Sequence, residues 1–131
     1  MVTISLCMIV KNEERVLGRC LESVQEIADE IIIVDTGSED RTKEIAEKYH
    51  ARVFEQEWQD DFSRARNYSF SQAEMDYCMW LDADDIITKS EALKLKRWKE
   101  ETDGSSDVIM LRYVAGFDEK RNPTLVYYRE R

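Results

Sequence analysis

A short apolar run that ends in three carboxylates is the feature that most constrains this chain. The run is Tyr-Cys-Met-Trp-Leu at residues 77–81, and Asp82, Asp84 and Asp85 follow it. Apolar runs of this length are typical of strands that are buried on both faces of a parallel sheet. Because carboxylates are not buried in such a sheet without partners, we expect the strand to emerge into a cleft at Asp82.

Asp82 and Asp84 lie two positions apart, so in an extended segment both side chains point to the same side of the strand. Two hard oxygen ligands on one side suit a divalent cation that keeps several waters and bridges the phosphates of a substrate diphosphate. The alternative is that these aspartates only turn the chain and cap the next helix, which is the commoner role of an isolated Asp-x-Asp. The rest of the chain has to decide between the two.

Composition limits the possible functions. The 131 residues suffice for one domain spanning residues 1–131, and an apolar fraction of 43% provides a core. A formal net charge of −9 argues against nucleic acid as a partner, because a phosphate backbone would be repelled, although the phosphates of a nucleotide can be met locally. Nothing in the sequence predicts a transmembrane segment or a targeting signal.

The cysteines are Cys7, Cys20 and Cys78. Each lies in an apolar pattern, and their spacing is not that of metal ligands. We therefore expect reduced thiols in the core of a cytoplasmic protein.

Apolar runs alternate with stretches of helical periodicity along the chain. The expected strands are residues 3–10, 31–34, 52–55 and 77–81, and the expected helices end near residues 28 and 50, run over 62–72, and follow Thr88. This order predicts an α/β fold, Rossmann-like, with a mostly parallel sheet flanked by helices and right-handed crossovers. Residues 108–114 and 124–128 are two further expected strands, and the turn chemistry of residues 120–123 predicts that they pair antiparallel.

Polar residues at the expected helix starts are candidates for caps. Asn12 is a candidate N-cap for the first helix, and Thr36 or Ser38 for the second. Thr88 and Glu91 have the spacing of a capping box before the helix that follows residue 88.

Polar groups also follow three of the expected strands. Asn12 and Glu13 come after the first, Asp35 after the second, and Asp82 and Asp84 after the fourth. Ligands of open α/β sheets bind outside the carboxyl ends of the strands, where the strand order reverses. If the fourth strand lies beside the first, these groups meet in one crevice, which predicts a nucleotide site.

Four stretches occur in a fixed order: LCMIVKNEE at 6–14, IVDTGSED at 33–40, DFSRARN at 61–67 and WLDADD at 80–85. Together they resemble the family 2 glycosyltransferases of the GT-A fold, over about residues 3–87. The resemblance implies an enzyme that transfers a sugar from a nucleoside diphosphate sugar, usually a UDP-sugar, to an acceptor. The acceptor would be a glycan, a lipid or a protein, the transfer would invert the anomeric centre, and Mg²⁺ or Mn²⁺ would be the cofactor.

The matching motif positions imply roles for individual residues. Asp35 would hydrogen-bond the nucleobase, the backbone after Val10 and the side chain of Glu13 would line the same pocket, and Arg66 would lie near the diphosphate. The full set implied to bind the nucleotide sugar is Val10, Asn12, Glu13, Asp35, Ser38, Arg66, Asp82 and Ala83. The implied metal ligands are Asp84 and Asp82.

In that family the second half of the domain supplies the acceptor site and a carboxylate general base. We therefore expect this chain to be the nucleotide-sugar-binding portion, truncated before the acceptor half, with the base beyond Arg131. Asp118 and Glu119 are the late acidic pair within the chain. An uncovered strand edge near residues 124–128 would permit a homodimer.

Other interpretations stay open at this point. The chain could bind a nucleotide sugar without transferring it, or it could be a nucleotidyltransferase, although residues 11–14 are not the Gly-rich basic loop that such an enzyme would carry. Asp35 could simply begin a turn, and Arg66 could belong to a solvated helix face. Trp80 is expected in the core, and Trp58 is expected either to pack or to border the nucleotide-sugar pocket.

Overall fold

The computed structural model describes residues 1–58, 60–105, 111–117 and 123–129, with side chains up to residue 105. In chain order the elements are β1 (Ile4–Val10), α1 (Leu17–Ser23), β2 (Glu30–Asp35), α2 (Thr42–Lys48), β3 (Arg52–Glu55), α3 (Phe62–Ser71), β4 (Tyr77–Trp80), α4 (Lys89–Glu101), β5 (Leu111–Phe117) and β6 (Pro123–Arg129). The predicted alternation of strands and helices is confirmed.

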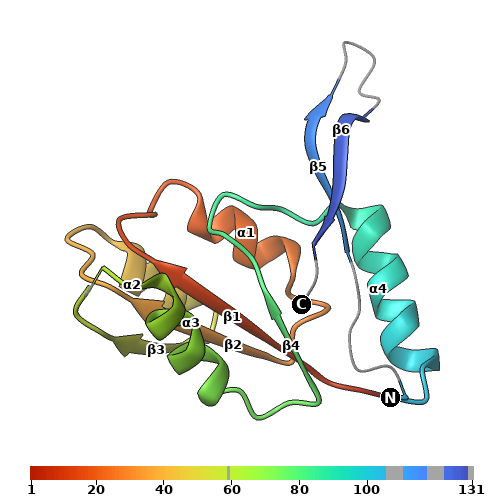
Figure 1. Ribbon diagram of the computed structural model, residues 1–131, viewed down its shortest axis with the longest axis horizontal. Coiled ribbons are helices and arrows are strands. Elements are labelled where there is room, and N and C mark those ends of the chain that lie inside the picture. The colour runs from red at the N-terminus through yellow and green to blue at the C-terminus, as the bar shows by residue number, and fades with distance from the viewer. Residues whose placement is uncertain (59, 106–110, 118–122, 130–131) are drawn as a thin grey trace.

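The main sheet has four parallel strands in the order β3-β2-β1-β4. Cys7 in β1 is in register with Ile32 on one side and with Trp80 on the other. The fourth strand lies beside the first, which is the condition stated above for a common crevice. The strand order therefore reverses after β3. The carboxyl ends of β1, β2 and β4 therefore face the same side of the domain (Figure 1).

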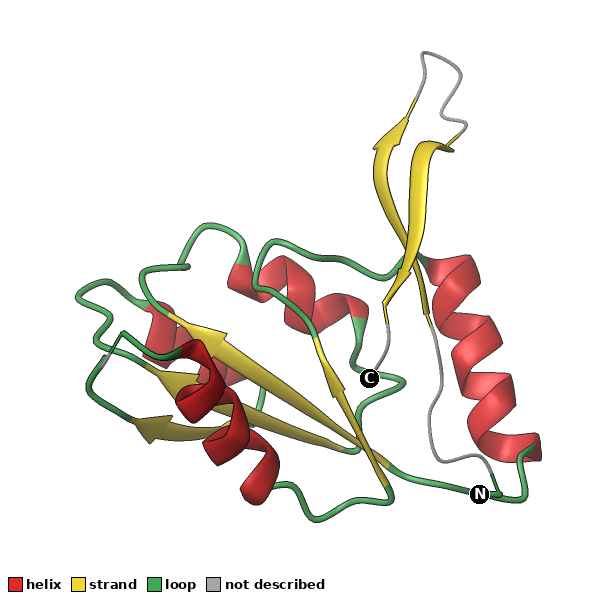
Figure 2. Ribbon diagram, in the orientation of Figure 1, coloured by secondary structure: helices red, strands yellow, loops and turns green. Residues whose placement is uncertain are grey.

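Helices cover both faces of this sheet, with α1 and α2 on one face and α3 on the other (Figure 2). Alternation along β1 explains the two layers. Leu6 and Met8 belong to one buried cluster with Leu17 and Leu21 of α1. Cys7 points the other way, where its thiol lies 3.6 Å from the carbonyl oxygen of Ser69 in α3.

The predicted caps are partly confirmed. The side chain of Thr88 accepts the backbone N–H of Glu91 at the start of α4. Asp61 caps α3 by accepting the N–H groups of Ser63 and Arg64, at 3.0 and 3.3 Å. Both helices thus begin at residues whose side chains satisfy otherwise unpaired backbone donors.

The other two cap predictions are wrong. Asn12 has a φ of 53° and does not begin α1. Neither Thr36 nor Ser38 caps α2, where Asp40 accepts the N–H of Thr42 at 2.9 Å. The physical reason is that Asn12 and Ser38 make hydrogen bonds between loops instead, as described for the site below.

The last helix is fixed to the amino end of the sheet. Trp98 of α4 packs edge to face on Tyr77 of β4, with ring centroids 5.2 Å apart. The buried ammonium group of Lys99 donates to the carbonyl of Ile27 at 2.7 Å and to the carboxylate of Asp29 at 2.6 Å. Because a buried charge is tolerated only when it is paired, this contact fixes α4 firmly.

Two predicted strands after α4 form a separate pair. β5 and β6 are antiparallel, as predicted, and the ribbon extends away from the main sheet (Figure 1). Residues 108–110 of the expected first strand lie outside the described residues. In the part of the chain that the structure describes, no helix has the length and apolar character needed to span a bilayer.

The predicted core thiols are confirmed for two of the cysteines. Cys7 and Cys20 are buried, whereas Cys78 is partly exposed. Burial raises the pKa of the Cys20 thiol to about 12, so this thiol stays protonated and unreactive at neutral pH.

A carboxylate links three segments at the amino end of the sheet. Glu30 accepts hydrogen bonds from the hydroxyl of Ser5 at 2.7 Å and from the N–H of Glu74 at 3.0 Å, and it pairs with Arg52 at 3.1 Å. Burial alone would raise the pKa of Glu30, but these hydrogen bonds and the charge of Arg52 outweigh it and hold the pKa below the ordinary value of 4.5.

We predict that Glu30→Gln lowers the free energy of unfolding by about 1–3 kcal/mol at pH 7, because it removes a charged acceptor from three partners. A group with a depressed folded-state pKa stabilises the fold above its unfolded pKa, and this contribution disappears as the pH falls through the folded-state value. The difference between variant and wild type should therefore shrink below about pH 4.5. Urea denaturation at several pH values measures it. Glu26→Gln, at an exposed position after α1, is the matched control and should have little effect at any pH.

Candidate functional site

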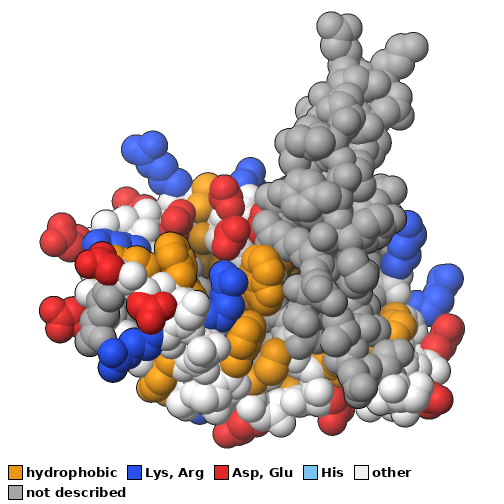
Figure 3. All heavy atoms as spheres, viewed as in Figure 1, with side chains coloured by type: hydrophobic (Ala, Val, Ile, Leu, Met, Phe, Trp, Pro, Cys, Tyr) orange, Lys and Arg blue, Asp and Glu red, His pale blue; other side chains and the backbone are white. Residues whose placement is uncertain are grey.

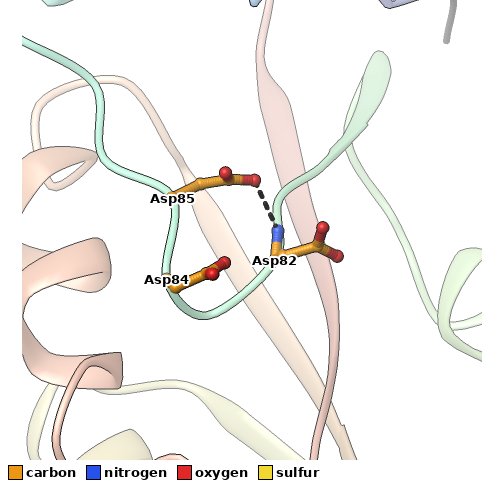
Figure 4. Close-up of side chains that lie close together, drawn as sticks. All are labelled: Asp82, Asp84 and Asp85. Atoms are coloured by element: carbon orange, nitrogen blue, oxygen red, sulfur yellow. Dashed lines mark hydrogen bonds between the residues drawn. The ribbon is translucent and has the colours of Figure 1, made fainter. Parts of the chain in front are cut away.

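The segment after β4 is a tight turn that gathers three carboxylates. Asp85 donates its N–H to the carbonyl of Asp82 at 2.9 Å, and its carboxylate accepts the N–H of Asp82 at 2.9 Å (Figure 4). Carboxylate oxygens of Asp82, Asp84 and Asp85 lie within 4.8 Å of one another. The extended geometry predicted for Asp82 and Asp84 is wrong because the Asp85 side chain closes the turn. The acidic turn, residues 82–85, still brings both predicted metal ligands together.

Ala83, in the middle of the acidic turn, is buried with the core. Its neighbours on both sides are exposed. Its side chain therefore anchors the turn to the core.

Glu13, after β1, lies close to the acidic turn. Partial burial raises the pKa of its carboxyl group, and the charges of Asp84, Asp40 and Asp82 raise it further. The charges of Asp82 and Asp84 thus reach Glu13, as expected when the fourth strand lies beside the first. Carboxylates that repel one another in this way form a site that a cation would stabilise.

Reciprocal hydrogen bonds join the loop after β1 to the loop after β2. The N–H of Asn12 donates to the hydroxyl of Ser38 at 2.9 Å, and the side-chain oxygen of Asn12 accepts the N–H of Glu39 at 2.8 Å. One residue on, the N–H of Glu13 donates to the hydroxyl of Thr42 at 2.8 Å. The side chains of Asn12 and Ser38 therefore hold these loops together, and we call this set of contacts the loop clamp.

Asp35, at the carboxyl end of β2, is buried, with 2% of its surface exposed. One carboxylate oxygen accepts the N–H groups of Gly37 and Ser38, at 2.9 and 2.8 Å. The other oxygen, Oδ2, is buried and has no hydrogen-bond partner among the described residues. The carboxylate thus forms the turn, and it leaves one acceptor unsatisfied.

A pocket with a volume of about 120 Å³ lies next to Asp35. The residues that line it are Thr36, Gln56, Glu57, Trp58, Asp61, Arg64 and Ala65. It adjoins Asp35 because the N–H of Gln56 donates to the carbonyl of Asp35 at 2.9 Å. Trp58 both borders this pocket and packs edge to face on Phe62, with ring centroids 4.9 Å apart. From the sequence, only Trp58, a tryptophan in a polar loop, indicated this pocket. Nothing in the sequence indicated that Gln56 lines it.

Arg66 projects from α3 over the ring of Trp80 in β4. The guanidinium carbon lies 4.6 Å from the ring centroid. The placement of Trp80 in the core is wrong, since the residue is partly exposed and does not belong to the buried core cluster. The coloured part of the face seen in Figure 3 carries charges of both signs rather than one basic stripe. The late acidic pair, Asp118 and Glu119, lies outside the described residues.

A parallel sheet of order 3-2-1-4, flanked by helices and carrying an acidic turn after the fourth strand, is the arrangement of the GT-A fold. The sequence matches the model of the family described as glycosyl transferase family 2 over residues 5–130, and the chain belongs to this family. The match extends well beyond residue 87, where the motif resemblance ended. It favours glycosyl transfer over nucleotidyl transfer.

Two curated relatives illustrate the similarity. The chain is 46% identical over 100 residues to the TPR repeat-containing protein Synpcc7942_0270 of Synechococcus elongatus, covering 76% of this chain and 23% of that protein. It is 30% identical over 130 residues to the lipopolysaccharide core biosynthesis glycosyltransferase LpsC of Rhizobium meliloti, covering 95% of this chain and 44% of that protein. The chain therefore spans less than half the length of either relative.

A solved structure shares the fold. It is glucosyl-3-phosphoglycerate synthase from Mycobacterium tuberculosis in complex with Mn²⁺, UDP and glucosyl-3-phosphoglycerate. The TM-score is 0.55 and the sequence identity 25%, with 63% of this chain and 33% of that chain covered.

The left-handed conformation of Asn12 leads to a prediction about stability. Asn12→Ala should lower the free energy of unfolding by about 1–2 kcal/mol more than Asn12→Gly does. Both variants lose the acceptor for Glu39, but only alanine is penalised at positive φ. Urea midpoints of the two variants measure this difference.

Asn67, an exposed residue within α3, provides the control pair. In a helix interior alanine is more stable than glycine by about 1 kcal/mol, so the order should reverse. Equal stabilities of the two Asn12 variants would show that the loop clamp does not depend on the left-handed conformation.

Proposed function

We propose that this chain binds a uridine diphosphate sugar and belongs to an enzyme that transfers the sugar to an acceptor. The observation that carries the proposal is Oδ2 of Asp35 at the carboxyl end of the sheet, which is buried and has no hydrogen-bond partner among the described residues. A buried acceptor without a partner is costly, and a ligand that donates a hydrogen bond there removes the cost. The family and the UDP-bound structural relative support the same ligand class.

The chemistry of Asp35 selects among nucleobases. Its Oδ1 is occupied by two backbone N–H groups, so the carboxylate offers only an acceptor to the ligand. The N3–H of uracil is a hydrogen-bond donor, whereas N3 of cytosine is an acceptor and would face Oδ2 without a proton between them. A uracil whose N3 edge faces Oδ2 therefore fits this position, whereas a cytosine in the same pose does not.

The acidic turn has the properties of a site for Mg²⁺ or Mn²⁺. Hard carboxylate oxygens from three aspartates lie within reach of one ion, and the repulsion on Glu13 indicates that negative charge is concentrated there. Asp84 and Asp82 would hold the ion, while Asp85 keeps the turn closed. When bound, such an ion neutralises the negative charge that develops on the departing nucleoside diphosphate.

The chain's own residues supply the rest of the donor site. The loop clamp fixes the walls beside Asp35, and Arg66 offers charge-assisted hydrogen bonds to the diphosphate. An acceptor hydroxyl, deprotonated by a positioned carboxylate, would attack the sugar from the side opposite the diphosphate and invert its configuration. The homodimer and the cytoplasmic location stay predictions.

UDP should bind this protein, and Mn²⁺ should strengthen the binding. Titration calorimetry with UDP, with and without Mn²⁺, measures both quantities. Asp84→Asn should lower the Mn²⁺-dependent gain in affinity at least about tenfold and leave the thermal midpoint unchanged or raised, because it relieves repulsion between carboxylates. Asp103→Asn, in the exposed turn after α4, is the control. It should leave both the affinity for UDP and the gain in affinity from Mn²⁺ unchanged. No heat with millimolar UDP would overturn the proposed function.

Asp35→Asn should reverse the nucleobase preference. The asparagine oxygen would keep the N–H groups of Gly37 and Ser38, which places the amide NH₂ at the position of Oδ2. That donor matches N3 of cytosine and opposes N3–H of uracil. UDP affinity should fall about 10- to 100-fold and CDP affinity should rise above it. A variant that still prefers UDP would exclude Asp35 from base recognition.

A further inference from the structure

We infer that Trp80 is a positioning residue, and that its ring orients the guanidinium of Arg66 toward the diphosphate of the ligand. This inference rests on the proposed function. The two residues come from different elements, α3 and β4, and meet with the guanidinium carbon 4.6 Å from the ring centroid. At this distance the attraction between the cation and the face of the ring is substantial.

Arg66 is available for a ligand because no described residue accepts a hydrogen bond from its N–H groups. Among the described residues, its guanidinium makes no hydrogen bond or ion pair. Arg52 shows the contrast, because it lies 5.4 Å from the ring of Phe54 and also pairs with Glu30 at 3.1 Å. The contact with Trp80 is one between a cation and the face of a ring. Since no described residue accepts a hydrogen bond from the guanidinium, its N–H donors are left for a bidentate anion such as a phosphate.

Trp80 also links Arg66 to the acidic turn. It is in register with Cys7 in β1, which places both side chains on the face of the sheet covered by α3. Asp82 follows two residues later, so the paired strand fixes the ring and the start of the turn together. A diphosphate held at the acidic turn would therefore meet Arg66 in an orientation that the strand has already set. Positioning of this kind lowers the entropy cost of binding.

The test compares UDP with uridine, which lacks the diphosphate. Trp80→Leu should lower UDP affinity about 2- to 30-fold, the range of a cation–π contact, and leave uridine affinity unchanged. In an Arg66→Gln background the same substitution should have no further effect on UDP, since the partner is already gone. Trp80→Phe, which keeps a weaker ring face, should lie between wild type and Trp80→Leu.

Trp98→Leu is the matched control. Trp98 is also partly buried and packs on a ring, that of Tyr77, but it does not lie beneath a cation in the described structure. This variant should lower the thermal midpoint without separating UDP from uridine affinity. NMR titration measures the weak uridine binding, and calorimetry measures UDP.

The outcomes separate this inference from the proposed function. If Trp80→Leu lowers the affinities for UDP and uridine equally, Trp80 supports the fold and does not position Arg66. The same conclusion holds if Trp80→Leu lowers UDP affinity as much in the Arg66→Gln background as in the wild type. If Trp80→Leu does not fold, Trp80→Phe takes its place, and its effect on UDP affinity is compared in the wild type and in the Arg66→Gln background. If wild-type protein binds neither ligand, the proposed function is overturned, and the inference with it.

Discussion

The pairing of β4 with β1 is the constraint on which the site depends. Parallel hydrogen bonding fixes the register of Met79 against Leu6 and of Trp80 against Cys7, and it leaves β4 no freedom to slide. Because β2 pairs with the other edge of β1, the ends of all three strands open on one side. Strand pairing alone therefore brings residues that lie far apart in the sequence, such as Asp35 and Asp82, to the same side of the domain.

The polar groups at this end of the sheet are arranged at a cost to stability. Among the described residues, Oδ2 of Asp35 is buried without a hydrogen-bond partner, and the carboxylates of Asp40, Asp82 and Asp84 repel that of Glu13. Both features raise the free energy of the protein without a ligand. At the opposite end of the sheet the buried charges are paired. Glu30 is paired with Arg52 and bonded to Ser5, and Lys99 is paired with Asp29. The described charges at the amino end are thus paired, while the buried acceptor without a partner and the repelling carboxylates lie at the carboxyl end.

Sequence reasoning succeeded where local pattern determines structure. Continuous apolar runs predicted the parallel strands, and the motif order predicted the family and the neighbourhood of the site. It failed where contacts distant in the sequence decide. Asn12 adopts a left-handed conformation because Ser38 and Glu39 bond to it, and no property of residues 11–14 reveals that. Likewise the alternation rule cannot foresee that the side chain of Asp85 closes a turn at Asp82.

The loop clamp explains how exposed segments can form a precise site. The loops after β1 and β2 bury little apolar surface of their own, so on propensity alone they would be mobile. Instead the side chain of Asp40 accepts the N–H of Glu14, and the side chain of Glu14 accepts the N–H of Arg41. These two bonds repeat the reciprocal pattern of Asn12 two residues further along each loop. Each bond is worth only about 0.5–1.5 kcal/mol. Neither loop can move without breaking several at once, so together they hold the walls beside Asp35 before a ligand arrives, and the ligand is spared the entropy cost of ordering them.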